Sequence, residues 1–385
     1  MTSYPTRAQT EIAAELITLS ENRPLDQVLR SEFKRRKGLS RGDSAVISGL
    51  TQAYYRWVGW LQPSNPLISQ ITEASQLDRR FQEKPNSFSD AELIEKSVPS
   101  WVAQEMDCGA GFVRALQSKP LLWLRARPGD AAILAGRLGN AEEDEARWKD
   151  AVLYHGTEDL FRNEFFQNGD FEIQDLNSQA IGWLCAPKSG ETWWDACAGE
   201  GGKTLHLSDL LRNQGLIWAS ETAEWRLEIL RRRAARARVF NYRGVLWKDQ
   251  TKPPTKTRFD GVLVDAPCTG SGTWQRNTQA RWTTSHESVE RLADLQLRLL
   301  CLAAGSVKPG GKLIYSVCTL LRQETAGVIA KFEKACSEFQ RFETPNPWTA
   351  KPLTEHWFWP QETRGNGMFA AVWKRAPSAA APAGS

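Results

Sequence analysis

One stretch decides the fold: Thr192-Trp-Trp-Asp-Ala-Cys-Ala-Gly-Glu-Gly-Gly-Lys-Thr-Leu-His-Leu-Ser-Asp-Leu210. Its apolar start ends at the carboxylate of Asp195, a glycine-rich turn follows, and leucines then recur at helical spacing. This order predicts a strand, a tight turn and a helix. In an open α/β sheet, such a turn presents backbone N–H groups and a helix N-terminus to a ligand at the carboxyl edge of the strand.

The glycines in this turn do not have the spacing of a phosphate-binding motif. The stretch has neither the Gly-x-x-x-x-Gly-Lys-[Ser/Thr] of a P-loop nor the Gly-x-Gly-x-x-Gly of a dinucleotide site. A glycine-rich turn after a strand-end Asp is instead typical of S-adenosylmethionine sites, because a carboxylate suits that cationic cosubstrate. Taken alone, the turn could also be only a connection between a strand and a helix.

Beyond Gly169, short apolar runs alternate with helical patterns, which is typical of a parallel, doubly wound sheet. The predicted strands are Thr192–Trp194, Leu216–Ser220, Val245–Trp247, Gly261–Val264, Lys312–Ser316 and a closing strand, Met368–Trp373. The predicted helices are Lys203–Arg212, Ala223–Arg236, Glu287–Ala303 and Glu324–Lys334. The fold class is therefore predicted to be α/β with a Rossmann-like sheet.

The region before Gly169 has two other patterns. Apolar positions recur at helical spacing from Thr6 to Leu77, which predicts an all-helical domain, and the polar run Gln82–Asp90 predicts a linker. Leu93–Asn168 mixes helical and strand patterns, which indicates a small α+β subdomain. The predicted domains are residues 1–82, 91–168 and 169–375.

Within the small subdomain, strands are predicted at Leu121–Ala126 and Ala151–Tyr154, with a helix at Ala131–Leu138. The acidic run Glu142, Glu143, Asp144 and Glu145 is expected to form a solvated loop. At the end of the chain, the Ala, Pro, Ser and Gly residues of 376–385 predict a disordered tail.

The composition is that of an ordinary soluble protein, with 41% hydrophobic and 24% charged residues among 385. No apolar run approaches the roughly twenty residues of a membrane span, so we expect a cytoplasmic protein with no membrane partner, and a monomer. Seven cysteines without Cys-x-x-Cys pairs argue against a disulfide framework and a zinc site, and no metal is expected.

Weak signs of a polynucleotide partner accompany this composition. The net charge is +4, and 17 tryptophans offer aromatic surface, although most tryptophans fill cores. A basic cluster near the second helix could contact phosphates or could be a solvated helix end: Arg30, Lys34, Arg35, Arg36, Lys37 and Arg41. A second run is expected to face solvent for the most part: Arg231, Arg232, Arg233, Arg236 and Arg238.

Acidic residues follow three further predicted strands, as Asp195 follows the first. Glu221 and Asp265 stand directly at strand ends, and Asp249 comes two residues after a strand. Carboxylates at successive carboxyl edges can bind ribose hydroxyls, an adenine amine and a cationic centre. Four such acids beside a glycine turn therefore favour a nucleoside-type ligand over chance helix capping.

Two cysteines follow strands of the same sheet. Cys268 lies in Asp265-Ala-Pro-Cys-Thr-Gly-Ser-Gly, and Cys318 lies in Tyr315-Ser-Val-Cys-Thr. If these strands are parallel to the first, both thiols face the cosubstrate edge. A thiolate that adds to carbon 6 of cytosine turns carbon 5 into a nucleophile, which a methyl donor can then alkylate. An isolated cysteine is usually a buried inert thiol, but two at one such edge favour chemistry.

At these motifs the sequence resembles the Sun-type RNA (cytosine-5-) methyltransferases, over almost the whole chain. The matching motifs are Asp195 to Lys203, Asp265-Ala-Pro-Cys268 with Gly270 and Gly272, Arg281-Trp282, Gln296 with Leu299 and Leu300, Gly169 to Gln179, and Gly365-x-Gly367-Met-Phe369. The helical start, with Arg7, Leu29, Asp43, Leu50 and Tyr55, resembles the NusB-like domain of the bacterial members that act on ribosomal small-subunit RNA.

The resemblance implies a role for each site residue. Cys318 would be the nucleophile that adds to cytosine, and Cys268 would assist release of the methylated product. S-adenosyl-L-methionine would be the cosubstrate, and RNA, most simply 16S ribosomal RNA, would be the substrate and partner. The implied cosubstrate-binding residues are Asp195, Cys197, Ala198, Gly199, Glu200, Gly201, Gly202, Lys203, Glu221, Arg226, Asp249, Asp265 and Pro267.

Some positions depart from the family's pattern, and other function classes stay open. Glu200 replaces a usual proline, Glu221 a usual Asp, Val317-Cys318-Thr319 a usual Thr-Cys-Ser, and Asn277-Thr278 a usual His-Pro. One alternative is a DNA cytosine-5 methyltransferase, which would attack with Cys268 and leave Cys318 unexplained. The other is a catalytically idle RNA- or ribosome-binding protein, which the intact acids and thiols disfavour.

Overall fold

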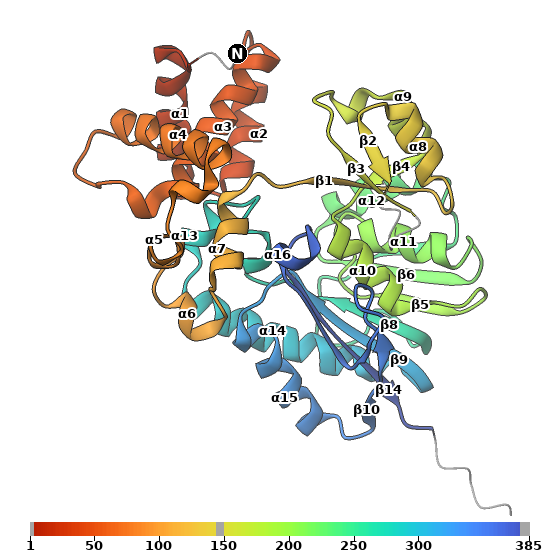
Figure 1. The fold of residues 1–385 in the computed structure, drawn as a ribbon. Coiled ribbons are helices and arrows are strands. Elements are labelled where there is room, and N and C mark those ends of the chain that lie inside the picture. Colours follow the sequence, from red (N-terminus) through yellow and green to blue (C-terminus); the bar gives the residue numbers. More distant parts are fainter. Residues whose placement is uncertain (1–3, 144–149, 378–385) are drawn as a thin grey trace, which may run out of the picture. The chain divides into compact units, whose positions relative to one another are not determined.

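The structure, a computed structural model, describes residues 4–143 and 150–377. It divides into two compact units (Figure 1). The helical unit contains the residues up to Pro120 together with Thr269–His286, and the sheet unit contains Leu121–Cys268 and the residues from Glu287 onward. The predicted fold class, with a helical start and an α/β sheet that follows it, is confirmed.

The helical unit begins with four longer helices whose apolar stripes form one core. Its helices are α1 (Arg7–Ser20), α2 (Leu25–Arg35), α3 (Arg41–Trp57), α4 (Leu67–Glu83), α5 (Asp90–Lys96), α6 (Val102–Glu105), α7 (Ala110–Gln117) and α13 (Ala280–Thr283). Leu16, Val28, Ile47 and Ile71 meet in the core, each from a different helix. Capping boxes start α1 and α3 and supply partners for backbone N–H groups that a helix start leaves free.

The predicted linker at Gln82–Asp90 is wrong. Helix α4 continues to Glu83, and Phe88 is buried with its ring 5.0 Å from that of Trp57 and 5.6 Å from that of Phe81. A single large aromatic residue inside a polar run is enough to fix the segment, because its burial is worth a few kcal/mol (about 1.5–3). Helices α5 to α7 also belong to the helical unit, so this unit extends well past the predicted boundary at residue 82.

The segment Thr269–His286 is built into the helical unit, although the sequence pattern assigned it to the sheet domain. Arg281 is fully buried there and donates to the carbonyl oxygens of Ser97 at 3.0 Å and Leu116 at 3.1 Å. Burial without a carboxylate partner lowers the pKa of Arg281 to about 9. Trp282 Nε1 donates to the carbonyl oxygen of Tyr55 at 2.6 Å, so two consecutive side chains anchor the segment.

The sheet unit is organised around a large sheet with strand order β10-β14-β9-β8-β5-β6-β7, and β13 pairs with β14 (Figure 1). Its strands are β5 (Thr192–Asp195), β6 (Leu216–Glu221), β7 (Tyr242–Leu246), β8 (Phe259–Asp265), β9 (Val307–Val317), β10 (Phe339–Arg341), β13 (Glu355–Phe358) and β14 (Met368–Arg375). Strands β5 to β9 pair in parallel, as predicted, while β10, β13 and β14 are antiparallel.

Side chains alternate between the two faces of this sheet and enter two separate cores. Trp193, Leu263 and Ile314 point into one core, and Trp194, Val264 and Tyr315 point into the other. The helices of the first face are α10 (Leu176–Cys185) and α11 (Gly202–Leu210), and those of the second are α14 (His286–Ala304) and α15 (Ala326–Ala335). Burial on both faces explains why these strands read as apolar runs.

Several boundaries in the sheet unit differ from the predictions, and the largest difference is at β9, which begins at Val307 instead of Lys312. Strand β7 begins at Tyr242 instead of Val245 and ends before Trp247, and the helix predicted from Glu324 begins at Ala326 after a short 3-10 turn. Helix α12 (Glu224–Arg236) packs Leu227, Leu230 and Ala234 against the glycine turn and β6. The remaining short elements are α16 (Pro360–Thr363), β11 (Thr344–Pro345) and β12 (Pro352–Leu353).

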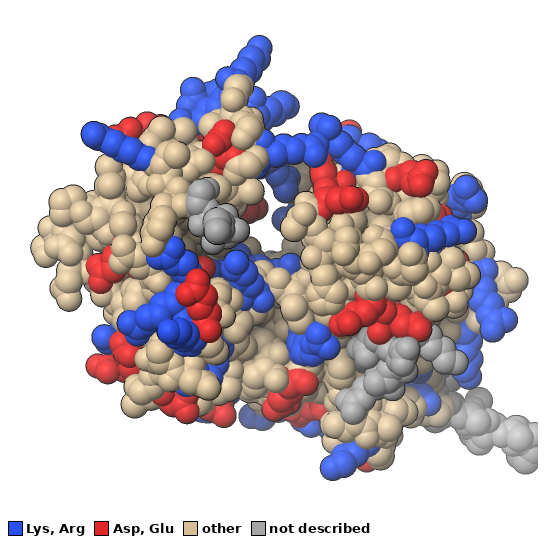
Figure 2. Space-filling view, turned by 45° about the horizontal axis from the view of Figure 1, so that its top comes forward, with Lys and Arg blue, Asp and Glu red and all other residues tan. Residues whose placement is uncertain are grey.

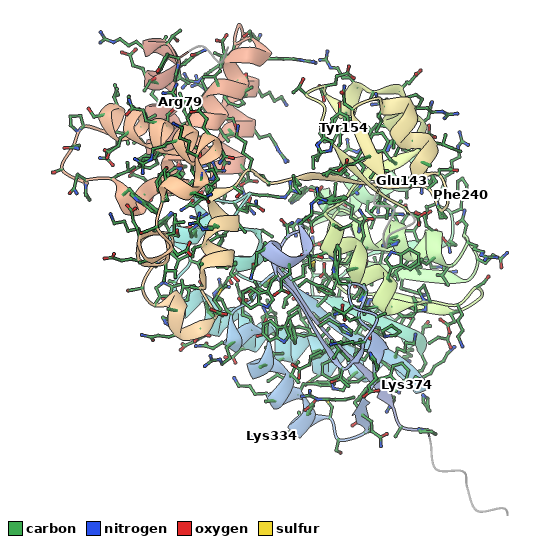
Figure 3. All side chains as sticks on the ribbon, viewed as in Figure 1. Arg79, Glu143, Tyr154, Phe240, Lys334 and Lys374 are labelled. Atoms are coloured by element: carbon green, nitrogen blue, oxygen red, sulfur yellow. The ribbon has the colours of Figure 1, made fainter. Side chains whose placement is uncertain are left out.

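A small antiparallel sheet with strand order β2-β3-β1-β4 completes the sheet unit. It contains β1 (Leu122–Ala126), β2 (Ala141–Glu143), β3 (Ala151–Tyr154) and β4 (Phe171–Ile173), with α8 (Ala131–Leu138) and α9 (Glu164–Asn168). The loop predicted at the acidic run is wrong for Glu142 and Glu143, because Glu142 pairs with Leu153 and Glu143 with Val152. Figure 3 labels Glu143 and Tyr154 on this sheet.

Asp144 and Glu145 of the acidic run, and residues 378–385 of the predicted tail, lie outside the described residues. Among the helices that the structure describes, none is both long and apolar enough to cross a membrane.

Candidate functional site

Three of the predicted site carboxylates lie at the same edge of the large sheet. Asp195 ends β5, Glu221 ends β6 and Asp265 ends β8. Because β6 and β8 pair with β5 in parallel, the three strand ends are neighbours at the carboxyl edge. This is the edge at which open α/β sheets bind ligands.

The glycine turn after β5 is held by the neighbouring strands. Ala196 N donates to the carbonyl oxygen of Leu263 in β8 at 2.9 Å, and Ala198 N donates to that of Ser220 in β6 at 2.9 Å. Gly201 has a φ of +89°, and a Cβ there would lie 2.7 Å from Cγ of Leu230. Only glycine meets both the conformation and the close approach of α12, which is why the sequence has it at this position.

Asp195 is completely buried, and its Oδ2 accepts a hydrogen bond from Thr204 Oγ1 at 2.7 Å. Burial raises the pKa of Asp195 to about 7, against the lowering effect of the Thr204 hydroxyl. The site therefore holds a carboxyl group that gains its negative charge near neutral pH. A cation that approaches this carboxyl group will favour the ionised form.

Lys203, in the first turn of α11, reaches across to the end of β8. Its Nζ lies 2.7 Å from Oδ2 of Asp265, and Ser316 Oγ donates to the other oxygen, Oδ1, at 2.7 Å. Burial alone would lower the pKa of Lys203, but the carboxylate of Asp265 more than offsets it, and the pKa is raised. The pair places a cation and an anion at the carboxyl edge of the sheet, next to the loops that carry Cys268 and Cys318.

The two remaining predicted carboxylates differ in their surroundings. Glu221 is buried, and its Oε1 accepts from Thr222 N at 2.7 Å and from Ala223 N at 2.9 Å. Arg226 Nη1 lies 3.7 Å from Oε2 of Glu221, so the structure brings these two predicted residues together. Asp249 follows β7 and is exposed, and its carboxylate accepts from N and Oγ1 of Thr251, which lower its pKa.

The two predicted thiols converge. Sγ of Cys268 and Sγ of Cys318 are 3.3 Å apart, although 50 residues separate them in the sequence. The hydrogen bond between the two thiols lowers the pKa of Cys318, and Lys203 also lowers it, while burial and Asp265 act in the opposite sense. A thiolate is the reactive form of cysteine, so Cys318 has the electrostatic surroundings of a nucleophile.

Three further predicted residues line the same loops. Cys197 is partly buried, and burial raises the pKa of its thiol well above the ordinary value. Pro267 uses its carbonyl oxygen to accept from Gln296 Nε2 at 2.9 Å. Glu200 is exposed, and its carbonyl oxygen accepts from Arg233 Nη1 at 3.1 Å, so a side chain of α12 restrains the backbone of the glycine turn.

Arg233 is itself fixed by a buried acid. Glu172 of β4 is 2% exposed and pairs with Arg233 at 2.9 Å and with Arg236 at 2.6 Å. The other three arginines of this run, Arg231, Arg232 and Arg238, are exposed, as expected for most of the run. The run therefore divides into two groups: Arg233 and Arg236 form ion pairs with a buried acid, and the other three arginines face solvent.

The basic cluster near α2 is partly neutralised. Arg35 pairs with Glu32, and Arg36 pairs with Glu15 at 2.6 Å and with Glu32 at 3.5 Å. Figure 2 shows Lys and Arg side chains interspersed with Asp and Glu over the face in view. Arg30, Lys34 and Lys37 remain exposed and can meet phosphates, which requires no sequence-specific geometry. Among the large apolar side chains that the structure describes in the sheet unit, Phe240, labelled in Figure 3, is the most exposed, at 77%.

Some residues of the site were not found from the sequence. Thr204 and Ser316 each donate to a site carboxylate, and Gln296, Tyr315 and Glu324 form a buried network behind the thiol loops. Their side chains have no spacing signature, although Gln296 stands in a motif that the resemblance singled out, and Tyr315 and Ser316 stand in the stretch around Cys318. Within residues 4–143 and 150–377, the structure contains no group of three or more His, Cys, Asp or Glu residues that could hold a metal ion.

Comparison with known proteins gives a family match over the sheet unit. Residues 183–374, about half of the chain, match the family model described as 16S rRNA methyltransferase RsmB/F. A Bacillus subtilis protein named "Probable ribosomal RNA small subunit methyltransferase B" is 32% identical over 260 residues, which cover 64% of this chain and 58% of that protein. The "Ribosomal RNA small subunit methyltransferase B" of Sodalis glossinidius is 30% identical over 273 residues, which cover 66% of this chain and 62% of that protein.

The chain thus spans about three fifths of the length of these two curated relatives. Among solved structures, PH0851 matches with a TM-score of 0.79 at 22% identity and covers 97% of this chain and 99% of its own. The structure of NSun6 from Pyrococcus horikoshii with SFG matches with a TM-score of 0.62 at 18% identity, over 70% of this chain and 94% of its own. At these identities the two structures show a shared fold.

Proposed function

The chain belongs to the 16S rRNA methyltransferase RsmB/F family, and from that premise we propose that it methylates carbon 5 of a cytosine in 16S ribosomal RNA. The observation that carries the proposal is the 3.3 Å separation of the Cys268 and Cys318 sulfurs at the carboxyl edge of parallel strands. Two thiols in one place match a reaction that needs one sulfur to attack and a second group to assist release.

The residues at this edge fit S-adenosyl-L-methionine as cosubstrate. The glycine turn offers backbone close to a ligand, Glu221 offers a carboxylate for hydroxyl groups, and Asp195 offers one whose ionised form a cation favours. Relatives with this fold include a structure determined with SFG. When bound, the cosubstrate supplies an electrophilic methyl group. Asp195, Glu221, Arg226, Asp249 and the turn from Cys197 to Lys203 would hold it.

The protein's own contribution begins with the sulfur of Cys318. Its thiolate forms a bond to carbon 6, and the electron pair of the 5–6 double bond becomes available at carbon 5. After carbon 5 has been methylated, its hydrogen leaves as a proton, the double bond forms again, and the electron pair of the carbon–sulfur bond returns to Cys318. Cys268, 3.3 Å from the departing sulfur, assists this release.

The target base must leave its stack to reach these thiols. A cytosine inside an A-form helix cannot present carbon 6 to a side chain, so the substrate segment is single-stranded, looped or flipped out. The helical unit, whose resemblance to NusB-like domains stays a prediction, and the exposed arginines Arg231, Arg232 and Arg238 offer charge for the RNA backbone.

Labelling with tritiated S-adenosylmethionine tests the proposal. We expect the purified protein to label small-subunit ribosomal RNA, and Cys318→Ala to abolish labelling because it removes the nucleophile. Cys268→Ala should instead accumulate a covalent protein–RNA adduct that survives a denaturing gel, because release is impaired. Bisulfite sequencing of the labelled RNA identifies the cytosine.

The same experiment separates the alternatives. An adduct that forms with Cys318→Ala and not with Cys268→Ala reverses the two roles and favours a DNA-type mechanism. RNA binding without any labelling by the wild-type protein favours a catalytically idle binding protein, and labelling of DNA in place of RNA favours a DNA methyltransferase.

A further inference from the structure

A chain of buried hydrogen bonds lies behind the two thiol loops. Gln296 of α14 donates from Nε2 to the carbonyl oxygen of Pro267 at 2.9 Å and to Oε1 of Glu324 at 2.9 Å. Pro267 is the residue before Cys268, so Gln296 holds the first thiol loop by its backbone.

The other end of the chain reaches the second thiol loop. Oε2 of Glu324 accepts from Thr319 Oγ1 at 2.9 Å, and Thr319 is the residue after Cys318. Tyr315 donates from its hydroxyl group toward Gln296 Oε1 at 2.9 Å and toward the Glu324 carbonyl oxygen at 2.6 Å. Gln296, Tyr315, Thr319 and Glu324 are all fully buried.

Such a network is costly in the core of a sheet protein. Each buried polar group loses its hydration and needs a hydrogen-bond partner, and a buried carboxylate carries the largest desolvation cost. Apolar side chains would fill the same space without that cost. The network connects two loops that separate after the β8–β9 ladder, near whose end Ala266 N donates to the Ser316 carbonyl oxygen at 2.9 Å. Because the network joins the two loops that carry Cys268 and Cys318, its position indicates a role beyond stability.

We propose that Glu324 is a positioning residue that, through Gln296 and Thr319, sets the distance between the Cys268 and Cys318 sulfurs. One of its oxygens accepts from Gln296, which holds the first loop through the Pro267 carbonyl, and the other accepts from Thr319 in the second loop, so a shift of either loop strains a charge-assisted hydrogen bond in a buried place. The catalytic consequence rests on the proposed methyltransferase function, but the positioning itself can be measured without RNA or cosubstrate.

Thr319→Val is the most direct test, because it removes the hydroxyl group and keeps the shape and the Glu324 charge. Thr319→Ser keeps the hydroxyl group and should restore the wild-type behaviour. Thr325→Val is a matched control, since the Thr325 hydroxyl is also fully buried but donates to the carbonyl oxygen of Leu321 at 2.8 Å, outside the network. Thermal unfolding of each variant checks that the sheet unit is intact.

The readout is the rate at which diamide joins Cys268 to Cys318. The two thiols lose two protons and two electrons to the diazene, which becomes a hydrazine, and peptide mapping identifies the cross-linked pair among the seven cysteines. We expect Thr319→Val to slow the cross-link about tenfold, as an unsatisfied buried acceptor shifts an equilibrium by that order. Thr319→Ser and Thr325→Val should stay within about twofold of the wild type.

A well-folded Thr319→Val protein that cross-links at the wild-type rate overturns the proposal. If Thr319→Val does not fold, Gln296→Met breaks the network at its other bond, and it should show the same slowing. In a methylation assay, Thr319→Val should lower kcat with little change in KM for RNA, which a general loss of folded protein would not produce. If the wild-type protein methylates no RNA, the proposed function fails, while the cross-linking rates still decide whether Glu324 positions the thiols.

Discussion

The ion pair between Lys203 and Asp265 gives the sharpest prediction about the site. Its N–O distance is 2.7 Å, and the two side chains are 12% and 25% exposed. Lys203→Met keeps roughly the length of the side chain but removes its charge. Of the two donors described above, Asp265 then keeps only the Ser316 hydroxyl. The variant therefore tests both the stability that the pair provides and its electrostatic effect on Cys318.

The magnitude follows from partial burial. Removal of one partner from a fully buried pair costs about 3–5 kcal/mol, and the partial exposure of Asp265 together with its second hydrogen bond reduces this to about 2–3 kcal/mol. Lys203 also lowers the pKa of Cys318, after the larger effect of Cys268. We expect urea denaturation to show the loss of stability, and alkylation of Cys318 by iodoacetamide to move to higher pH.

Lys308→Met is the control for this experiment. Lys308 pairs with Asp260 at 2.8 Å in the same unit, but the two side chains are 42% and 30% exposed, so its loss should cost at most about 1 kcal/mol. It should leave the alkylation profile of Cys318 where it is. Equal losses of stability for the two lysine variants, or an unmoved Cys318 profile in Lys203→Met, would refute the reasoning.

Two further predictions concern buried ionisable groups. Burial raises the folded-state pKa of Asp195 to about 7, above the ordinary value of about 4, so its contribution to stability is full below about pH 4 and is lost as pH rises through about 7. Asp195→Asn should remove this decline, whose slope is up to about 1.4 kcal/mol per pH unit, in urea denaturation at a series of pH values. Arg281→Met should destabilise the helical unit by about 2–4 kcal/mol in urea denaturation followed by near-UV circular dichroism, because the Ser97 and Leu116 carbonyl oxygens lose their donor; a variant as stable as the wild type would contradict this account of Arg281.

The large sheet could be predicted because its strands are buried on both faces and end in recognisable residues. Apolar runs that stop at Asp195, Glu221 and Asp265 mark both the strands and the edge of the ligand site. The helical unit was predicted only to residue 82, since its later part depends on Phe88, a single apolar residue between two helices that packs on Trp57 and Phe81 and belongs to no periodic pattern.

The assignment of residues 269–286 to the helical unit could not be predicted for a related reason. Local pattern shows where a segment is apolar or helical, but not which core it enters. Arg281 illustrates the difficulty, because a charged residue in a sequence indicates a surface, whereas here its guanidinium is fully buried among backbone carbonyl groups. Burial of a charged side chain of this kind can be recognised only from the three-dimensional positions of its acceptors, here the carbonyl oxygens of Ser97 and Leu116.

The two thiols of the candidate site were easier to predict than the polar side chains behind them. The sulfurs of Cys268 and Cys318 could be expected at one edge from strand order alone, and the structure places them 3.3 Å apart. Gln296 and Glu324 are common polar residues at positions that a helical pattern leaves unremarkable. Their importance lies in partners on two other segments, and that information is three-dimensional.

The placement of one proton bears on the choice between an RNA-type and a DNA-type mechanism. When Cys268 donates its S–H to Cys318, Cys318 is the sulfur that can carry the negative charge, and its lowered pKa has this hydrogen bond as its largest cause. Lys203 adds a positive charge on the same side of the balance. A DNA-type mechanism needs the reverse, with Cys268 as thiolate and Cys318 as donor. Since either sulfur can donate in this pair, a variant decides between the two arrangements: if Cys318 carries the charge, Cys268→Ser, which keeps a donor, should retain more of the lowered Cys318 pKa than Cys268→Ala.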